Sequence, residues 1–514
     1  MQIRSASLLN SKKNWRPAIH RILPLLACSI FTMAHAADTV HGMQPATQNG
    51  MKEAEAAAMP EVGPHATERL LYWNQVAIDA SGLDHTPVAP GEKRVFGEQL
   101  GPHRSSRAMA IVHIAMFDAA NAIMREYQPF SHYMYAPRKA LIDAAIAQAA
   151  HDTLVAMYPS QAAAFDAKLA NDIGNMPVKA PEQKAEGIAI GKRAASAIMA
   201  LRNNDGATLH NEPLLGVDYI PGNRAGEWSQ DPVSRLPKAI GAYWGTDVKP
   251  FVIHSATQFR IAPPPALGSA AYTTAYNEVK ALGGDGIVTP TFRTEEQTRI
   301  GLFWAYDGTP SLCAPPRLYN QVTTQVAQQQ GVYNVLELAR LLALVNVAMA
   351  DAGLASWESK YYYRFWRPVT GVRGTPADDG NPDTVPDPGF SPLGAPLSNG
   401  SGPNFTPPFP AYPSGHATFG GAVFQTLRNF FGTDDIAFTV TSDEFNGTTR
   451  DIHGNLRPLW VRQFKNFSEA EEENGQSRIY LGIHWAFDKT AGIDQGRKVA
   501  DYIYNRMLRR MQDD

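Results

Sequence analysis

Apolar residues recur at helical spacing over most of the chain from about residue 64 onward. Met109, Val112 and Met116 fall on one face of a helix, and the alanine-rich stretches 141–158 and 184–202 keep the same period. Alternating apolar and polar positions, which would indicate strands, are scarce. The pattern therefore predicts an all-α fold of helical bundles, in which helices bury their apolar faces against one another.

The second half of the sequence carries the clearest helix boundaries. Thr294 and Gln297 fit a capping box, and Asn334 fits an N-cap ahead of a long apolar-periodic stretch. Pro368 ends that stretch, because the residue before a proline is biased away from helical geometry, and Gly432 is suited to a helix C-terminus. We expect helices at about 294–306, 334–367 and 414–432.

Residues 1–36 have the composition of a secretory signal peptide. Positive charges precede the apolar run Ile22–Met33, which is followed by Ala34-His35-Ala36. We expect cleavage before Ala37 and an exported protein, periplasmic or secreted. The apolar run is too short to span a bilayer, so no membrane span is expected. A membrane-anchoring helix and a lipid-modified Cys28 are the alternatives that remain open.

The length of 514 residues and a hydrophobic content of 44% are enough for two domains, each with a core. The segment 204–292 is rich in proline and glycine and carries only short apolar runs, so it is expected to form a long, ordered excursion between two helical halves. The predicted organisation is a signal peptide at 1–36, a linker at 37–63, an N-terminal helical region at 64–292 and a C-terminal helical domain at 293–514.

Charge and cysteine content exclude several classes of protein. The formal net charge is −3, so the chain has no global basic field for nucleic acid or an anionic membrane, and any anion site must be local. Cys28 and Cys313 are the two cysteines of the sequence, and signal cleavage would leave Cys313 alone. A single cysteine excludes an internal disulfide and a cysteine-based metal cage.

Two segments combine cations with a helix end. Lys360 and Arg367 are seven residues apart, which on one helix would place both on the same side. Ser414-Gly415-His416 opens a predicted helix, where unpaired backbone N–H groups favour an anion, and where Gly415 permits close approach. Taken separately, the first pair is more often a solvated surface pair, and Ser414 is as often a simple N-cap.

A third segment holds Arg478 and His484, six residues apart and separated by a predicted break at Gly482. Asp488 follows His484 by four residues, so its carboxylate can accept a hydrogen bond from one imidazole nitrogen and aim the other inward. Three cations, backbone and hydroxyl donors and two histidines suit a tetrahedral oxyanion. They do not suit a divalent cation, which would need carboxylates or several neutral ligands.

In order and spacing, these segments resemble the three-part signature of the superfamily that unites type-2 phosphatidic-acid phosphatases and vanadium-dependent haloperoxidases. All signature positions are filled between residues 360 and 488. Outside that range, three further stretches are similar to bacterial haloperoxidase-like chains: Arg107–Asn121, Phe303–Asp307 and Phe467–Ala470. The resemblance thus extends over most of the chain after the signal peptide.

The signature is common to both branches, so other residues must separate them. Phosphatase members are small single bundles or multi-span membrane proteins, whereas this chain adds an N-terminal helical half. Trp357 and Phe409 match aromatic positions beside the halide pocket of chloroperoxidase-type members, although either could be ordinary core. Asp307 follows a predicted helix C-terminus, where the helix dipole disfavours a negative charge, and by resemblance it would pair with Arg478.

The resemblance implies a vanadate cofactor, with no haem, bound directly through His484. The vanadate oxygens would be held by Lys360, Arg367, Ser414, Gly415 and Arg478. Lys360 would polarise hydrogen peroxide, His416 would exchange protons, and halide would be oxidised to hypohalous acid, which halogenates a small organic acceptor.

Two other functions remain open from the sequence. One is a periplasmic acid phosphatase or phosphotransferase with His484 as nucleophile and His416 as the proton donor. The other is a non-catalytic oxyanion-binding protein, which would not need both histidines. The sequence leaves the physiological substrate, halide preference, affinity for vanadate over phosphate and oligomeric state undetermined, as well as the use of the glycosylation motifs at Asn446 and Asn466.

Overall fold

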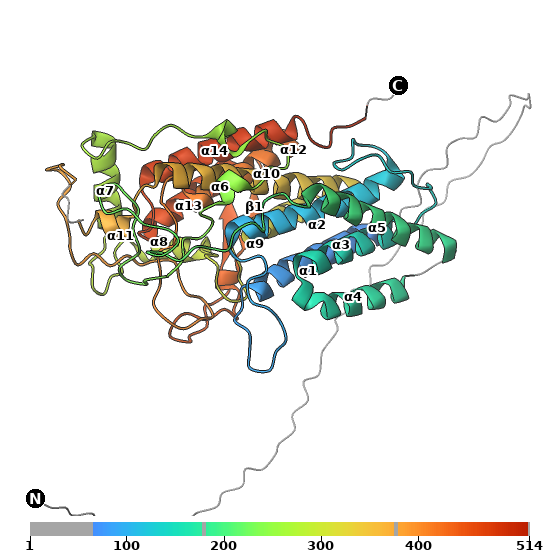
Figure 1. Ribbon diagram of the computed structural model, residues 1–514, viewed down its shortest axis with the longest axis horizontal. Coiled ribbons are helices and arrows are strands. Elements are labelled where there is room, and N and C mark those ends of the chain that lie inside the picture. Colours follow the sequence, from blue (N-terminus) through green and yellow to red (C-terminus); the bar gives the residue numbers. More distant parts are fainter. Residues whose placement is uncertain (1–64, 177–180, 375–378, 512–514) are drawn as a thin grey trace, which may run out of the picture. The chain divides into compact units, whose positions relative to one another are not determined.

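A computed structural model describes residues 65–176, 181–374 and 379–511, and in this part of the chain helices dominate (Figure 1). The predicted signal peptide and the predicted linker lie outside the described residues. The N-terminal half contains α1 (Ala66–Asp84), α2 (Gly101–Met124), α3 (Ile142–Met157), η1 (Pro159–Gln161), α4 (Ala162–Asn175), α5 (Pro181–Arg202), α6 (Trp244–Asp247), η2 (Ala256–Phe259) and α7 (Ala270–Leu282).

The C-terminal half continues the helical architecture and adds one small antiparallel sheet, in which Phe438 pairs with Phe464. The all-helical prediction is confirmed. The elements are α8 (Glu295–Phe303), α9 (Pro315–Gln329), α10 (Val335–Tyr363), α11 (Pro368–Gly371), α12 (Gly415–Phe431), β1 (Phe438–Thr441), η3 (Asp443–Phe445), β2 (Val461–Phe464), α13 (Phe467–Tyr480) and α14 (Ala486–Tyr504).

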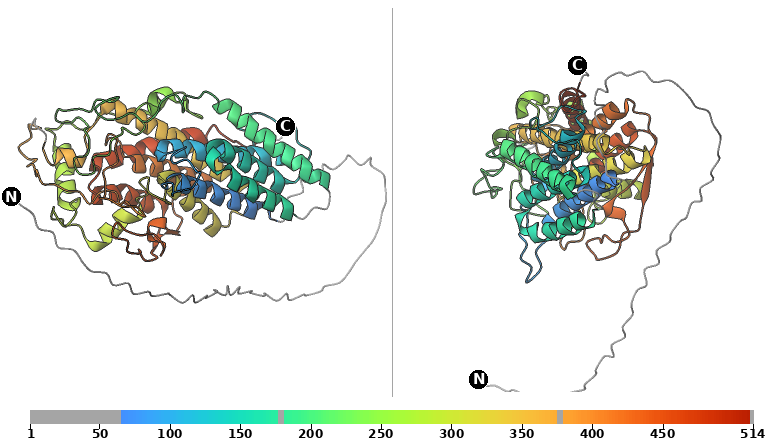
Figure 2. Two further views of the ribbon diagram at one scale, coloured as in Figure 1. Left: turned by 60° about the horizontal axis from the view of Figure 1, so that its bottom comes forward. Right: turned by 90° about the vertical axis from the view of Figure 1, so that its right-hand side faces the viewer.

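Helix α10 is the centre of the core. It packs against α2, α12 and α14, and nearly all its residues up to Lys360 are buried. Helices α3 and α5 pack on each other and on α2 at one end, while α7, α8 and α11 lie at the other end (Figures 1 and 2). The predicted domain boundary between residues 292 and 293 stays a prediction. Helices α2 and α10, which lie on either side of it in the sequence, pack against each other.

Helices α2 and α10 are long and apolar enough to cross a membrane by length and composition. In both, 94% of the most apolar window is buried inside the fold. That degree of burial is typical of the core helices of a globular protein, which pass the same test of length and hydropathy.

Two helix boundaries differ from those expected. Helix α8 ends at Phe303 rather than near Tyr306, because Tyr306 adopts a left-handed φ of 46°. Helix α10 ends at Tyr363 because Arg364 adopts a left-handed φ of 50°. Arg367 is therefore the residue preceding α11, and the expectation that it shares a helix face with Lys360 is wrong.

The proline- and glycine-rich excursion 204–292 is mostly irregular, but it contains a longer helix for which its short apolar runs gave no signal. Helix α7 spans 13 residues and is preceded by the N-cap Ser269, whose side chain accepts a hydrogen bond from the backbone N–H of Tyr272. Tyr272, Tyr276 and Val279 are buried on one face of it. Tyrosine and threonine have only modest helix propensity, so the helix depends on this burial.

Candidate anion-binding active site

Four segments meet at the site that the sequence predicts. They are the C-terminal end of α10, the N-terminus of α12, the connection between α13 and α14, and the loop 304–314. Lys360, Arg367, Ser414, Arg478 and His484 are each at most 2% exposed, and His416 is 5% exposed. The interior thus holds a dense group of cations and imidazoles that needs a compensating negative charge.

Lys360 is fixed by the loop that precedes α12. Its Nζ donates to the carbonyl oxygens of Pro410 and Ala411, each at 3.0 Å, and to that of Pro413. Burial and the neighbouring Arg367 lower the pKa of Lys360 well below its usual value. Each of the three carbonyl acceptors nevertheless needs a hydrogen, so the amine in this arrangement carries all three and is an ammonium.

Arg367 connects the loop before α12 with the turn before α14. Its Nε donates to the carbonyl oxygen of Phe409 at 2.9 Å, and its Nη1 donates to that of Ile483 at 2.8 Å. The same Nη1 lies 2.9 Å from Nε2 of His484. Because a guanidinium can only donate, Nε2 of His484 is the acceptor and carries a lone pair.

The other nitrogen of His484 faces Asp488 on the first turn of α14. Nδ1 lies 2.8 Å from the Oδ2 of Asp488, which also accepts from the N–H of Trp485 at 3.0 Å. Burial is the largest cause that lowers the pKa of His484, followed by the charge of Arg367, while burial raises the pKa of Asp488 to about 7. His484 is therefore a neutral imidazole with Nδ1 protonated and Nε2 free to act as a ligand.

Gly482 makes this turn possible. Its φ of 72° breaks the chain direction between α13 and α14, as expected, and a Cβ there would lie 2.4 Å from the carbonyl oxygen of Gly283. Only glycine fits such a position. The turn at Gly482 thereby brings Arg478 and His484, six residues apart in the sequence, into one site.

Arg478 is paired with Asp307, as the position of that aspartate after a helix C-terminus suggested. Its Nη2 lies 2.7 Å from both carboxylate oxygens. Burial raises the pKa of Asp307, and the charge of Arg478 opposes that rise. The pair fixes the direction of the guanidinium but uses only one of its three nitrogens.

The N-terminus of α12 supplies further donors and a histidine. Ser414 is the N-cap of α12, so the N–H groups of Gly415 and His416 have no acceptor within the helix. Nε2 of His416 lies 2.5 Å from the carbonyl oxygen of Ala305, which can only accept, so Nε2 is protonated and Nδ1 faces Asp307 at 3.9 Å. Burial, and then the charge of Arg478, lower the pKa of His416 well below its usual value.

The loop 304–314 that carries Asp307 is held in an unfavourable conformation. Tyr306, Ser311 and Cys313 all have left-handed φ values, of 46°, 67° and 58°, which non-glycine residues rarely adopt. The Oη of Tyr306 accepts from the N–H of Asp443 at 2.5 Å, and Cys313 lies 2.8 Å from the hydroxyl of Ser81. These contacts fix the backbone on which Asp307 and the Ala305 carbonyl depend.

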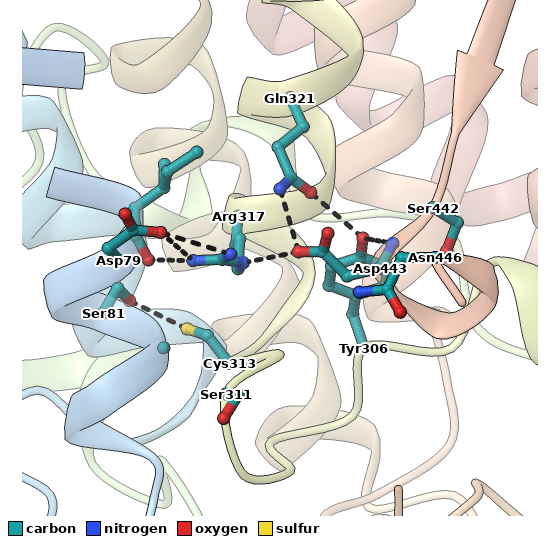
Figure 3. A network of polar contacts seen from close by, with 12 residues as sticks. Asp79, Ser81, Tyr306, Ser311, Cys313, Arg317, Gln321, Ser442, Asp443 and Asn446 are labelled. Atoms are coloured by element: carbon teal, nitrogen blue, oxygen red, sulfur yellow. Dashed lines mark hydrogen bonds and ion pairs between the residues drawn. The ribbon is translucent and has the colours of Figure 1, made fainter. Parts of the chain in front are cut away.

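Arg317 on α9 joins the elements on both sides of this loop (Figure 3). Its Nε donates to Asp443 at 2.9 Å, and its Nη1 lies 3.4 Å from Asp79 on α1. Gln321, one turn further along α9, also donates to Asp443 at 2.9 Å. The network ties α1, α9 and η3 together behind the site.

Three guanidinium nitrogens in the site have no protein partner. They are Nη2 of Arg367 and Nε and Nη1 of Arg478, all of them buried. A buried donor without a hydrogen-bond partner destabilises the folded state, and a charged donor does so more than a neutral one. The arrangement is therefore suited to an acceptor that the protein does not supply. A tetrahedral oxyanion offers several acceptor oxygens and negative charge together.

A cavity of about 450 Å³ opens onto these groups. Seven of the residues that the sequence singled out line it: Asp307, Trp357, Phe409, Gly415, His416, Arg478 and His484. Lys360, Arg367 and Ser414 are not among the residues that line it. The rings of Trp357 and Phe409 are 5.0 Å apart, and Nζ of Lys360 is 5.1 Å from the centre of the Phe409 ring.

Sequence reasoning missed the backbone carbonyls that orient the site, those of Ala305, Phe409, Pro410 and Ala411. The stretch 407–413 contains four prolines, which have no N–H group and prevent regular pairing, so carbonyl oxygens there stay available as acceptors. That composition is the signal that could have located the partners of Lys360. Sequence reasoning also missed the role of Tyr306, for which no local sequence signal exists.

In the described part of the chain, no group of three or more histidine, cysteine, aspartate or glutamate side chains is arranged to hold a metal ion.

Comparison with known proteins gives the family. Residues 340–513 match the family model described as the VCPO second helical-bundle domain. The vanadium chloroperoxidase of Curvularia inaequalis is 33% identical, over 83% of this chain and 80% of its own length.

Two bacterial crystal structures show the same fold. A vanadium-dependent iodoperoxidase matches with a TM-score of 0.66 and 22% identity, over 86% of this chain and 97% of that one. A holo-type vanadium-dependent chloroperoxidase matches with a TM-score of 0.57 and 16% identity, over 82% of this chain and 95% of that one. The identity to the fungal enzyme over most of both chains decides the assignment: this chain belongs to the family of vanadium-dependent haloperoxidases.

Proposed function

We propose that this enzyme binds vanadate between Arg367, Arg478 and the N-terminus of α12, and that it uses hydrogen peroxide to oxidise halide to hypohalous acid. The observation that carries the proposal is the set of three buried guanidinium nitrogens without a protein partner, next to the lone pair of His484. Vanadate is a tetrahedral oxyanion that would satisfy these donors, and an imidazole nitrogen is a suitable direct ligand for vanadium.

The residues fit this cofactor in number and kind. Arg367 and Arg478 would donate to its oxygens, together with the Ser414 hydroxyl and the Gly415 N–H, and Lys360 would add a fixed positive charge. His484 would be the direct ligand through Nε2, which requires that Arg367 release this nitrogen. Bound vanadate would supply a fully oxidised Lewis acid that activates hydrogen peroxide without itself changing oxidation state.

His416 is the residue suited to moving protons. Its Nε2 is held by the Ala305 carbonyl, and its Nδ1 remains unprotonated at neutral pH because the pKa of the ring is lowered. Nδ1 can therefore take a proton from a hydrogen peroxide molecule that enters the cavity and return it to the leaving oxygen. Asp307 lies close enough to stabilise the imidazolium that forms in between.

The aromatic wall of Trp357 and Phe409 is proposed as the halide pocket. Apolar rings beside a cationic centre exclude water, which strengthens the attraction between the cations and a halide ion. By its likeness to the fungal chloroperoxidase, the enzyme is proposed to oxidise chloride as well as bromide and iodide.

Export is a separate proposal, supported by the signal-like composition of residues 1–36. Its test is N-terminal sequencing of the protein recovered from the periplasm or the medium. An N-terminus at Ala37 supports export, and an uncleaved N-terminus on a cytoplasmic protein contradicts it.

The function is tested with His484→Ala, compared with the wild type after removal of bound oxyanion. Added vanadate is expected to restore bromide-dependent peroxide consumption in the wild type and not in the variant, because His484 is the proposed direct ligand of vanadium. His453, an exposed loop histidine, provides the matched control His453→Ala, which should keep full activity. Full activity of His484→Ala would contradict the proposed binding mode.

A further inference from the structure

The cavity above the anion site has two chemically different ends. Charged groups and imidazoles gather where His416, Arg478 and His484 meet, whereas the opposite walls are apolar. The apolar walls come from three separate segments, namely the loop before α2, the excursion 204–292 and the stretch before α12. Their side chains include Phe96, Leu100, Leu236, Ile240 and Phe405.

The volume of about 450 Å³ is far larger than the proposed reaction with peroxide and halide requires. Both reactants are small, and the apolar wall proposed for the halide needs only the rings of Trp357 and Phe409. Pockets of about 300–1,000 Å³ with mainly apolar linings and a few polar groups are the kind that bury organic ligands of drug size. Phe96 is 46% exposed at the rim while Phe405 is 9% exposed, so the apolar surface continues from the outside into the interior.

We infer that this apolar chamber binds an electron-rich aromatic molecule, such as a phenol, and holds it beside the site where halide is oxidised. The inference rests on the proposed function and names its organic substrate class. Aromatic rings would contact Phe96, Phe405 and Phe409 in offset or edge-to-face arrangements. A phenolic hydroxyl would be directed to the polar end, where His416 can hydrogen-bond to it.

The reaction then proceeds within the cavity rather than in bulk water. Hydrogen peroxide is reduced and halide is oxidised to hypohalous acid at the anion site. The ring carbon donates an electron pair to the halogen, a carbon–halogen bond forms, the halogen–oxygen bond breaks, and the ring proton is lost with the hydroxide as water. Overall, one aromatic C–H, one halide, one hydrogen peroxide and one proton give one aromatic carbon–halogen bond and two waters.

The test uses the vanadate-loaded enzyme with bromide, peroxide and phenol as the probe. The ratio of ortho to para bromophenol is compared with the ratio produced by adding hypobromous acid slowly to phenol. A chamber that holds the ring in one orientation shifts the enzyme's ratio at least twofold from that of free hypobromous acid. Leu236→Arg, which places a charge on the partly exposed chamber wall, should return the ratio to the free value.

Leu209→Arg is the matched control, because Leu209 lies in the same excursion, is 67% exposed and is not among the residues that line the cavity. Taurine, a small charged amine that traps hypobromous acid outside the protein, measures bromide oxidation separately. The inference is supported if the wild type, Leu236→Arg and Leu209→Arg brominate taurine at equal rates. In addition, only Leu236→Arg should differ from the wild type in its ratio of ortho to para bromophenol.

A wild-type ratio equal to that of free hypobromous acid, with normal taurine bromination, overturns the inference and leaves the proposed function intact. Absence of taurine bromination by the wild type overturns the proposed function itself. If the wild type shows a shifted ratio of ortho to para bromophenol and Leu236→Arg shows the same shift, the chamber is not its cause, and the inference is also overturned.

Discussion

At the scale of single residues, the site is defined by hydrogen-bond donors that the protein leaves unused. Arg478 directs Nη2 to Asp307 and keeps Nε and Nη1 free in a buried position. A lysine would keep the positive charge but lose this planar set of donors. The difference between the two side chains therefore isolates the role of the free nitrogens.

Arg478→Lys is predicted to weaken vanadate binding about 10- to 100-fold, corresponding to about 1.5–3 kcal/mol for a charge-assisted hydrogen bond. Equilibrium dialysis against vanadate measures the change. Arg299→Lys is the control, since Arg299 is an exposed residue on α8, and it should bind vanadate normally. Unchanged affinity in Arg478→Lys would show that the free nitrogens do not hold the anion.

Phe409→His tests whether the aromatic wall influences halide choice. The Phe409 ring lies 5.0 Å from that of Trp357 and 5.1 Å from Nζ of Lys360, so an imidazole here would place a titratable, hydrogen-bonding group beside the halide, with its pKa lowered by burial and by the nearby cations. The expected outcome is a changed ratio of chloride to bromide turnover and a shifted pH profile. Phe292→His, at an exposed position, should change neither, and an unaltered Phe409→His enzyme would reduce Phe409 to packing.

Residue-level expectations from the sequence succeeded where the chemistry is local. The His484–Asp488 contact follows from a four-residue spacing, and it is present at 2.8 Å. The Arg478–Asp307 pairing was expected from the resemblance and from a helix end that in fact lies at Phe303. The carbonyl partners of Lys360 come from residues 50 to 53 positions away, which no local pattern reveals.

At the scale of elements, the N-terminus of α12 is the part of the site that a helix supplies directly. A Cβ on Gly415 would lie 3.5 Å from the ring of Trp357 and 3.9 Å from Cε of Lys360. These are ordinary contact distances, so the fold can accept a methyl group there. The methyl group would nevertheless stand beside the backbone N–H groups that face the anion.

Gly415→Ala is therefore predicted to keep its thermal stability but to bind vanadate at least about tenfold more weakly, which corresponds to about 1.4 kcal/mol. Thermal unfolding and dialysis measure the two properties on the same sample. Gly174→Ala on α4, where a Cβ meets nothing within 4 Å, is the matched control. Normal vanadate affinity in Gly415→Ala would exclude a close approach at this position.

The segment η3 supports the loop 304–314 through a buried carboxyl group. Glu444 accepts from the hydroxyl of Ser398 at 2.6 Å and pairs with Arg457, and burial raises its pKa to about 7. In the unfolded chain Glu444 has its ordinary pKa of 4.5, so between pH 4.5 and pH 7 the folded state binds more protons than the unfolded state. The contribution of Glu444 to stability therefore falls as pH rises from 4.5 to 7.

Glu444→Gln is predicted to remove this dependence, which amounts to at most about 3 kcal/mol over that pH range. Tm measured at pH 5 and at pH 8 should fall less in the variant than in the wild type. Glu295→Gln, at an exposed position on α8, should leave the wild-type difference unchanged. An equal fall of Tm in Glu444→Gln and the wild type would assign the titration to another group.

Helix starts were predictable because caps are local. The capping box at Thr294 and the N-cap at Asn334 are both present in the structure. Helix ends were less predictable, because the left-handed residues Tyr306 and Arg364 carry no glycine signal. Helix α7 was missed because its stability comes from burial of Tyr272 and Tyr276 against distant residues, among them Trp485.

At the scale of the whole molecule, the helical class follows from the periodicity, but the cavity does not. Its walls join the loop before α2, the excursion 204–292 and the stretch before α12. Each of these segments is irregular, so their meeting depends on tertiary packing that periodicity does not report. The N-terminal half thus contributes to the cavity of the candidate site, since it supplies apolar walls to a cavity whose charged end belongs to the C-terminal half.

The measurement that tests the central claim most directly is the initial rate of bromide-dependent peroxide consumption by the vanadate-free enzyme as vanadate is added. Hydrolysis of a phosphate monoester is followed on the same samples. The account predicts a saturable rise in peroxide consumption at one vanadate per chain, with phosphate ester hydrolysis suppressed as vanadate binds. Rapid ester hydrolysis without vanadate, together with no peroxide consumption at any vanadate concentration, would contradict it.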